Sequence, residues 1–318
     1  MKPLTPRRAR AVSNVAYIFL LPLVVSCRDM YRQSIDSSSP AFSGGFGTWH
    51  DVPIRQPRSP GPGRPYEDVV HSSVWLDLRS EPWWFEVGAV SPTVEFVGTF
   101  VDLWGFTLEG CGDLSGMRGP ALVSAPVPLR DVPRGLTTIM RGESAFVALV
   151  TETSWRDPYA LPGHPPARTD LVLRPASTVL GRTVPAPLPP PSPPMEFGFD
   201  TTGRSDEFWS FANFALTLVT LNSEDRTVLE RIAEIGVAAG SPWSAAAFSD
   251  EIAEAIRAGM EDALNDLLEA AGEQRASRSA PSDRDTSARD TMDRDYFGRA
   301  LQTVSRSSLV GSHRWAPR

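Results

Sequence analysis

The clearest pattern of apolar and polar positions lies between Asp68 and Phe106, and it predicts three β-strands. Turn residues at 80–82 and 88–92 divide this stretch into runs of strand length. In the first two runs side chains alternate between two faces: Val74, Leu76 and Leu78 oppose Trp75, Asp77 and Arg79, and Trp83, Phe85 and Val87 oppose Trp84 and Glu86. The third run, Val94–Trp104, is apolar at nearly every position, which predicts a strand covered on both faces.

Further strand-length segments follow, separated by Pro and Gly. They are Ala121–Ser124, Leu136–Met140 and Ala145–Thr151. We therefore predict an α+β protein whose antiparallel β-sandwich, jelly-roll-like, is flanked by an N-terminal helix and a C-terminal helical segment.

The second half of the chain shifts to helical spacing. Helices are predicted over 206–221, 224–235 and 250–271, with Gly236 and Gly272 ending the last two. The predicted division is 1–34 N-terminal helix, 35–66 loop, 67–183 β-sandwich, 184–204 Pro-rich linker, 205–272 helical segment, 273–294 disordered linker and 295–318 a final short segment.

The N-terminus allows two interpretations. Arginines precede an apolar run, Val15–Val25, and Cys27 follows it, which is the outline of a lipoprotein signal. The alternative, which we favour, is a first helix that belongs to the fold. The run itself is too short to span a bilayer, so we expect a cytoplasmic protein with no membrane span.

Composition narrows the function classes. The net charge of −7 gives no basic field to attract nucleic acid. The two cysteines, Cys27 and Cys111, form no disulfide framework, and the four histidines have no paired metal-binding spacing. We expect no cofactor and no metal.

Several residues are candidates for chemistry. Asp77, Asp102 and His71 are the catalytic candidates, and Trp75, Arg79 and Trp104 are the candidates for ligand binding. The structural alternatives are a solvated ion pair near Asp77 and a buried Asp102 that pins the fold, with Arg79 as its partner.

The same residues resemble a known family. Ser72–Leu78, Glu81–Pro82 and Val101–Trp104 are similar to the core of the domain-of-unknown-function family 1254, and Asp295–Ala300 resembles the opening of its companion domain, family 1214. An Asn-x-Asp-Thr-like segment that precedes this motif in the family is missing before Ser72. The resemblance implies a jelly-roll-like sandwich and a companion domain of which only the start is present.

Two function hypotheses follow. The first is a binding module that holds a small apolar or carbohydrate-like ligand on Trp75, Trp83, Trp84 or Trp104, in a truncated and inactive form. The second is a hydrolase-like enzyme with an acid/base site at Asp77, Asp102 and His71. An apolar face left without its companion domain also predicts self-association.

Overall fold

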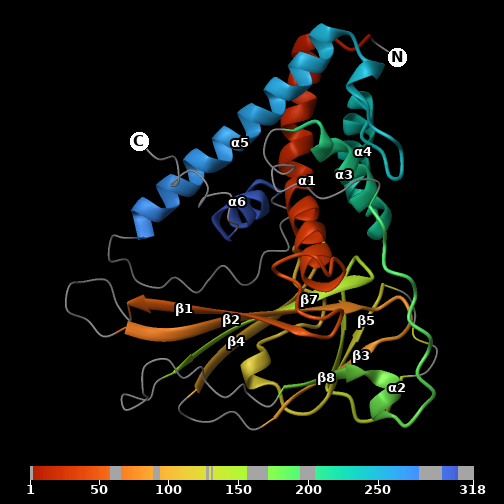
Figure 1. Cartoon of the computed structure of the whole chain (residues 1–318), viewed down its shortest axis with the longest axis vertical. Coiled ribbons are helices and arrows are strands. Elements are labelled where there is room, and N and C mark those ends of the chain that lie inside the picture. The colour runs from red at the N-terminus through yellow and green to blue at the C-terminus, as the bar shows by residue number, and fades with distance from the viewer. Residues whose placement is uncertain are drawn as a thin grey trace. The chain divides into compact units, whose positions relative to one another are not determined.

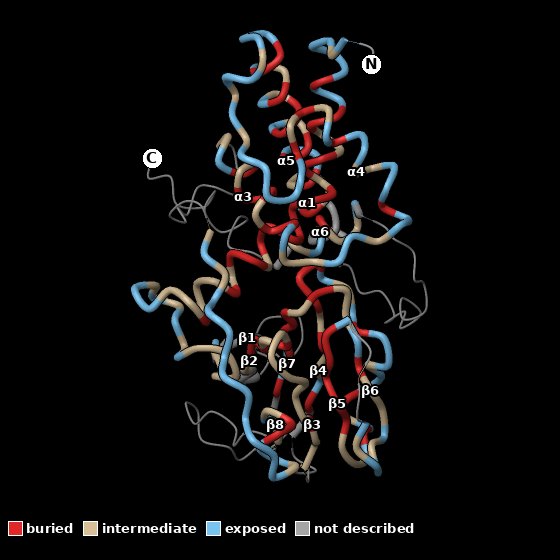
Figure 2. The backbone as a smooth tube through the Cα atoms, turned by 90° about the vertical axis from the view of Figure 1, so that its right-hand side faces the viewer, coloured by how far each residue is buried: buried red, intermediate tan, exposed pale blue. Residues whose placement is uncertain are grey.

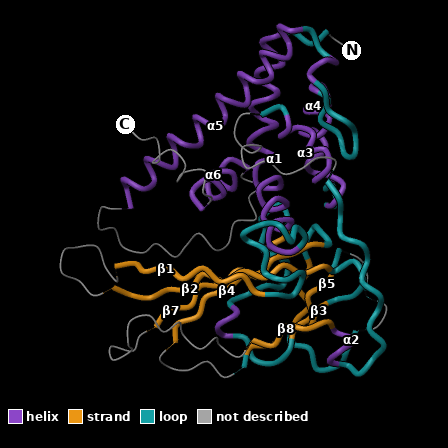
Figure 3. Tube along the Cα trace, viewed as in Figure 1, coloured by secondary structure: helices purple, strands orange, loops and turns teal. Residues whose placement is uncertain are grey.

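The computed structural model describes residues 3–57, 66–88, 94–126, 129, 132–155, 171–193, 205–278 and 296–306. These residues form a mixed α+β protein with two four-stranded sheets and with helices toward both ends of the chain (Figures 1 and 3). The chain divides into two compact units. We call Cys27–Ser192 with Leu218–Thr220 the strand unit, and Met1–Ser26, Pro193–Thr217 and Leu221–Arg318 the helical unit.

The strand unit contains two sheets, here called sheet A and sheet B. Sheet A has the order β1-β2-β7-β4 and is antiparallel throughout; its strands are β1 (Trp49–Pro57), β2 (Tyr66–Asp77), β7 (Phe146–Trp155) and β4 (Val94–Asp102). Sheet B has the order β6-β5-β3-β8; its strands are β6 (Thr138–Arg141), β5 (Ala121–Ser124), β3 (Trp83–Val87) and β8 (Leu171–Pro175). The β5–β6 pair is parallel, so the prediction of purely antiparallel pairing is wrong there.

One hydrophobic core is built from both sheets. Val74, Leu76 and Leu78 of the first predicted strand lie in it, which confirms the alternation read from the sequence. Across the core the rings of Phe85 and Phe100 meet edge to face, with centroids 5.0 Å apart. The prediction that β4 is covered on both faces is wrong, because the Val97 side chain is 58% exposed.

Strand β1 lies in a region predicted to be loop. It pairs with β2 along its whole length, from Trp49 opposite Val74 to Pro57 opposite Tyr66. The strand contains prolines at positions 53 and 57, which it can accommodate because β1 is an edge strand, where a missing backbone N–H that faces solvent costs no ladder hydrogen bond. The rest of the predicted loop at 58–65 lies outside the described residues.

The helical unit is built from α3 (Glu207–Ala215), α4 (Arg226–Ile232), α5 (Asp250–Arg278), α6 (Tyr296–Arg306) and the first part of α1 (Pro6–Ser34). Gly236 ends the second predicted helix with φ 81°, as expected. Gly272 does not end α5, which continues to Arg278 and so occupies the start of the predicted disordered linker. The remainder of that linker, 279–294, lies outside the described residues.

A four-residue helix, α2 (Ala176–Val179), follows β8 in the strand unit.

Helices α1 and α5 approach each other closely. The Ser13 hydroxyl donates to the Ile256 carbonyl at 2.5 Å, and a Cβ placed on Gly259 would lie 2.2 Å from the Arg10 carbonyl oxygen. A bidentate pair between Arg10 and Asp262 flanks the crossing. Figure 2 shows α1 buried over much of its length. Small residues at the crossing thus allow two backbones to touch.

Helix α1 is longer than the apolar run predicted from the sequence. Its 29 residues have the length and hydropathy to cross a membrane, yet 67% of its most apolar window is buried within the protein. Core helices of water-soluble proteins and N-terminal signals share these properties. Cys27 lies inside this helix and is 1% exposed. Burial raises the pKa of its thiol far above the ordinary range.

Candidate functional site

Asp102 is a buried carboxylate held by backbone groups. Its side chain accepts hydrogen bonds from the N–H of Phe106 at 3.0 Å and from the N–H of Glu143 at 2.9 Å. Burial raises the pKa of Asp102 from 3.8 to about 6, against the lowering effect of these N–H donors. The predicted partner, Arg79, is not among its contacts. Asp102 therefore connects two loops. The residue is only 1% exposed, so its carboxylate is not accessible to a substrate.

Arg79 instead forms a clamp with Asp77 on the opposite face of sheet A. Two guanidinium nitrogens bond the carboxylate, with Nη2 at 2.6 Å from Oδ2. The same nitrogen donates to the Pro189 carbonyl at 3.0 Å, and the guanidinium lies 4.9 Å from the centre of the Phe146 ring. The clamp thereby fixes the Pro-rich segment, whose described part at 184–193 contains no helix or strand.

Replacing Arg79 with alanine should release that segment. We expect a loss of about 1–3 kcal/mol in unfolding free energy, because Asp77 is left half-buried without its partner. Amide hydrogen exchange at the non-proline residues within 184–193 should then become faster. Arg226→Ala is the matched control, since its pair with Glu230 is 80% and 66% exposed and should contribute less than about 0.5 kcal/mol. Equal stability losses in the two variants would refute the clamp.

Two of the predicted binding residues are core residues. Trp75 is 5% exposed, and its indole N–H donates at 3.1 Å to the Gln33 side chain of α1, which also accepts from Ser73. Trp104 is 2% exposed. Neither indole offers a face on which a ligand could stack.

The structure does not bring the three catalytic candidates together. His71 and Asp77 share one face of β2, but six residues separate them by roughly 20 Å. Asp102 lies on the other face of sheet A, because its neighbour Val147 points into the core. His71 is exposed and has Glu152 at 3.5 Å as its ionic neighbour. The geometry of an acid/base pair around one substrate is therefore absent from these described residues.

Trp84 differs from the other candidate tryptophans in its surroundings. Trp83 packs against the core and donates to the Asp77 carbonyl, whereas Trp84 lies on the opposite, outer face of sheet B and is half-buried. In register it lies between Arg174 of β8 and Leu122 of β5. Glu86 follows two residues later on the same face.

Within the described part of the chain, the polar groups of Trp84, Glu86 and Arg174 bond no other residue. Glu86 is half-buried and Arg174 is exposed. An aromatic ring, a carboxylate and a guanidinium thus stand side by side with free hydrogen-bonding capacity. Glu86 and Arg174 were not predicted as site residues from the sequence. The alternation in Trp83–Val87 places Glu86 on the same face as Trp84, but no local sequence signal pairs β3 with β8.

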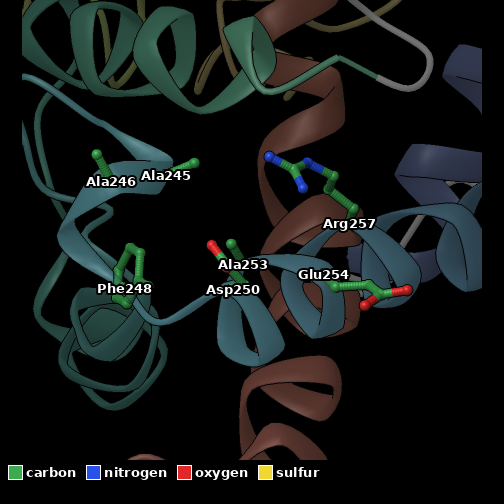
Figure 4. Close-up of a pocket in the computed structure, with 7 residues that line it drawn as sticks. All are labelled: Ala245, Ala246, Phe248, Asp250, Ala253, Glu254 and Arg257. Atoms are coloured by element: carbon green, nitrogen blue, oxygen red, sulfur yellow. The ribbon is translucent and has the colours of Figure 1, made fainter.

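The helical unit contains a pocket of about 450 Å³. Figure 4 shows it between the turn before α5 and the first two turns of that helix; it is lined by Ala245, Ala246, Phe248, Asp250, Ala253, Glu254 and Arg257. The Arg257 guanidinium is paired with Asp206 at 2.7 Å, which raises the pKa of Arg257. The Arg257 charge is thus already paired within the protein, and the other ionisable side chains of the lining are the carboxylates Asp250 and Glu254. No group of three metal-ligating side chains exists among the residues that the structure describes.

Comparisons with known proteins support the family resemblance. Residues 49–175 match the family described as "Protein of unknown function (DUF1254)". The crystal structure of the VPA0106 protein from Vibrio parahaemolyticus is similar with a TM-score of 0.60 and 16% identity, over 97% of this chain and 68% of that chain. At this identity the likeness shows the fold alone. No curated protein matches. The family match ends before residue 295, so the companion family 1214 segment stays a prediction.

Proposed function

We propose that the strand unit is a non-enzymatic β-sandwich module that binds a carbohydrate-like ligand on the outer face of sheet B. The observation that carries this proposal is the half-buried Trp84. Among the described residues, its ring makes no aromatic contact and its indole N–H donates no hydrogen bond. The proposal keeps one of the four tryptophans predicted from the sequence and moves the site away from Trp75 and Trp104, which are buried.

The sandwich assignment rests on the shared core. Residues of β2, β4 and β7 in sheet A and of β3, β5 and β6 in sheet B contribute to one cluster, which is the arrangement of two sheets packed face to face. In such an arrangement each sheet has an outer face, and Trp84 belongs to one of them. The jelly-roll topology is part of the same proposal.

The chemistry of the three side chains suits a polyol. The apolar face of a sugar ring packs on an indole ring, as flat amphipathic surfaces do. The Arg174 guanidinium supplies donors in a planar fork, and the Glu86 carboxylate supplies acceptors. A ligand with vicinal hydroxyls presents both donors and acceptors. It therefore matches Arg174 and Glu86 better than a purely apolar ligand does.

Isothermal titration of the full chain against a panel of neutral and acidic oligosaccharides tests the proposal. At least one sugar should bind, and Trp84→Ala should weaken that binding by about tenfold or more, equivalent to ~1.4 kcal/mol. Trp84→Phe keeps an aromatic platform and should retain most of the affinity.

A folded Trp84→Ala variant that binds as tightly as the unmodified chain would overturn the site. A panel without any binder would overturn the ligand class. Thermal unfolding of each variant separates lost binding from lost structure, and Arg174→Ala, at an exposed position, should lose affinity without losing stability.

A further inference from the structure

The outer face of sheet A carries a row of four side chains, one from each strand. Val52 of β1 lies opposite His71 of β2, His71 opposite Glu152 of β7, and Glu152 opposite Val97 of β4. Residues directly opposite each other in antiparallel strands point to the same face. We call this set the His–Glu row.

All four members of the His–Glu row are exposed. Val52 is 43% and Val97 58% exposed, and the His71 and Glu152 side chains are 46% and 52% exposed. An antiparallel sheet commonly leaves one face in water, and Val52 and Val97 lie on the two edge strands, β1 and β4. The row therefore combines one exposed valine at each end with an ionisable acid–base pair between them.

The neighbouring rows set the extent of this surface. On one side lies the row that contains Ser73 and Val150, and Val150 is 37% exposed. Beyond it comes the row of Trp75, which is buried and held by Gln33. The exposed surface therefore ends at the row of Trp75, near α1, and includes the His–Glu row.

We propose that the outer face of sheet A binds a second copy of this chain through the His–Glu row. Read from either end, the row has the order apolar, ionisable, ionisable, apolar, with opposite charge types at the two centre positions. A two-fold axis parallel to the strands, between His71 and Glu152, would place His71 of each copy over Glu152 of the other. The same operation places Val52 over Val97.

This self-complementarity is what selects a second copy as the occupant. A two-fold interface uses one patch on both subunits, so every favourable contact occurs twice. The row meets that condition for its acid–base pair and for its valines. An unrelated partner would require no such symmetry of the row.

Charge reversal tests the interface by sedimentation velocity of the full chain over a range of concentrations. The unmodified chain should be dimeric at high concentration. His71→Glu places two carboxylates opposite each other in both symmetric pairs and should weaken dimerisation at least about tenfold. The double variant with His71→Glu and Glu152→His reverses the row but restores its complementarity, so it should dimerise again.

A second pair of variants tests the apolar ends. Val97→Asp should produce a monomer, whereas Val184→Asp, at a position 53% exposed and outside sheet A, should dimerise as the unmodified chain does. A monomer at all concentrations would overturn the proposal, as would a dimer that His71→Glu and Val97→Asp leave intact. Trp84→Ala should leave the dimer unchanged, so this interface stands or falls independently of the sugar site.

Discussion

Gly259→Ala is expected to destabilise the helical unit by about 3 kcal/mol or more. The added methyl group would lie 2.2 Å from the Arg10 carbonyl oxygen and 2.9 Å from Ser13 Cβ. The nearest obstacle is backbone, which no side-chain rotation relieves. The helices would have to separate, and the hydrogen bond from Ser13 to Ile256 would lengthen. Thermal unfolding followed by helical circular dichroism measures the loss.

The same helix supplies the control. Nothing lies within 4 Å of a Cβ placed on Gly272. Gly272→Ala should be neutral or should stabilise α5 by up to about 1 kcal/mol, because alanine favours helix over glycine. Should both variants melt like the unmodified chain, the close approach of α1 and α5 would be disproved.

Asp102 should make the stability of the protein depend on pH in the acid range. The folded-state pKa is raised, from 3.8 to about 6, so the folded form binds the proton more tightly than the unfolded chain does. This contribution is fully present below pH 3.8 and is lost as pH rises toward about 6. It amounts to something on the order of 3 kcal/mol.

Asp102→Asn should remove this contribution to the pH dependence. The amide can accept only one of the two N–H bonds, so the N–H of Phe106 or of Glu143 loses its acceptor, at a cost of about 1–3 kcal/mol. Denaturant unfolding across the acid range compares the Asp102→Asn variant with the unmodified chain. If Asp102→Asn and the unmodified chain gave parallel profiles, Asp102 would not be the titrating group.

Local periodicity predicted the elements better than it predicted their partners. Alternation identified the core face of β2 and of β3, because one face of each strand packs against the other sheet. It failed for β1, since edge position makes prolines acceptable and is a property of the whole sheet. It also failed at Gly272, where the helix simply continues.

Prediction of the candidate site from the local sequence was limited in the same way. Aromatic content identified the tryptophans, but only the pairing of β3 with β8 distinguishes Trp84 beside Arg174 from the buried Trp75. Arg79 was correctly expected to form an ion pair. Its partner is Asp77, two residues away on the same face, because Asp102 faces the core on the other side of the sheet.

Helix α1 also bears on the order in which the protein can fold during synthesis. Its contacts with Glu234, Ile256 and Asp262 join residues separated by 226, 243 and 252 positions in sequence. At typical rates of synthesis, α1 waits roughly 10–50 s before these partners leave the ribosome. During that interval its apolar face is exposed, like that of a nascent targeting sequence. We therefore expect chaperones that hold apolar segments to engage this helix first, and the strand unit to be complete before α1 is fully buried.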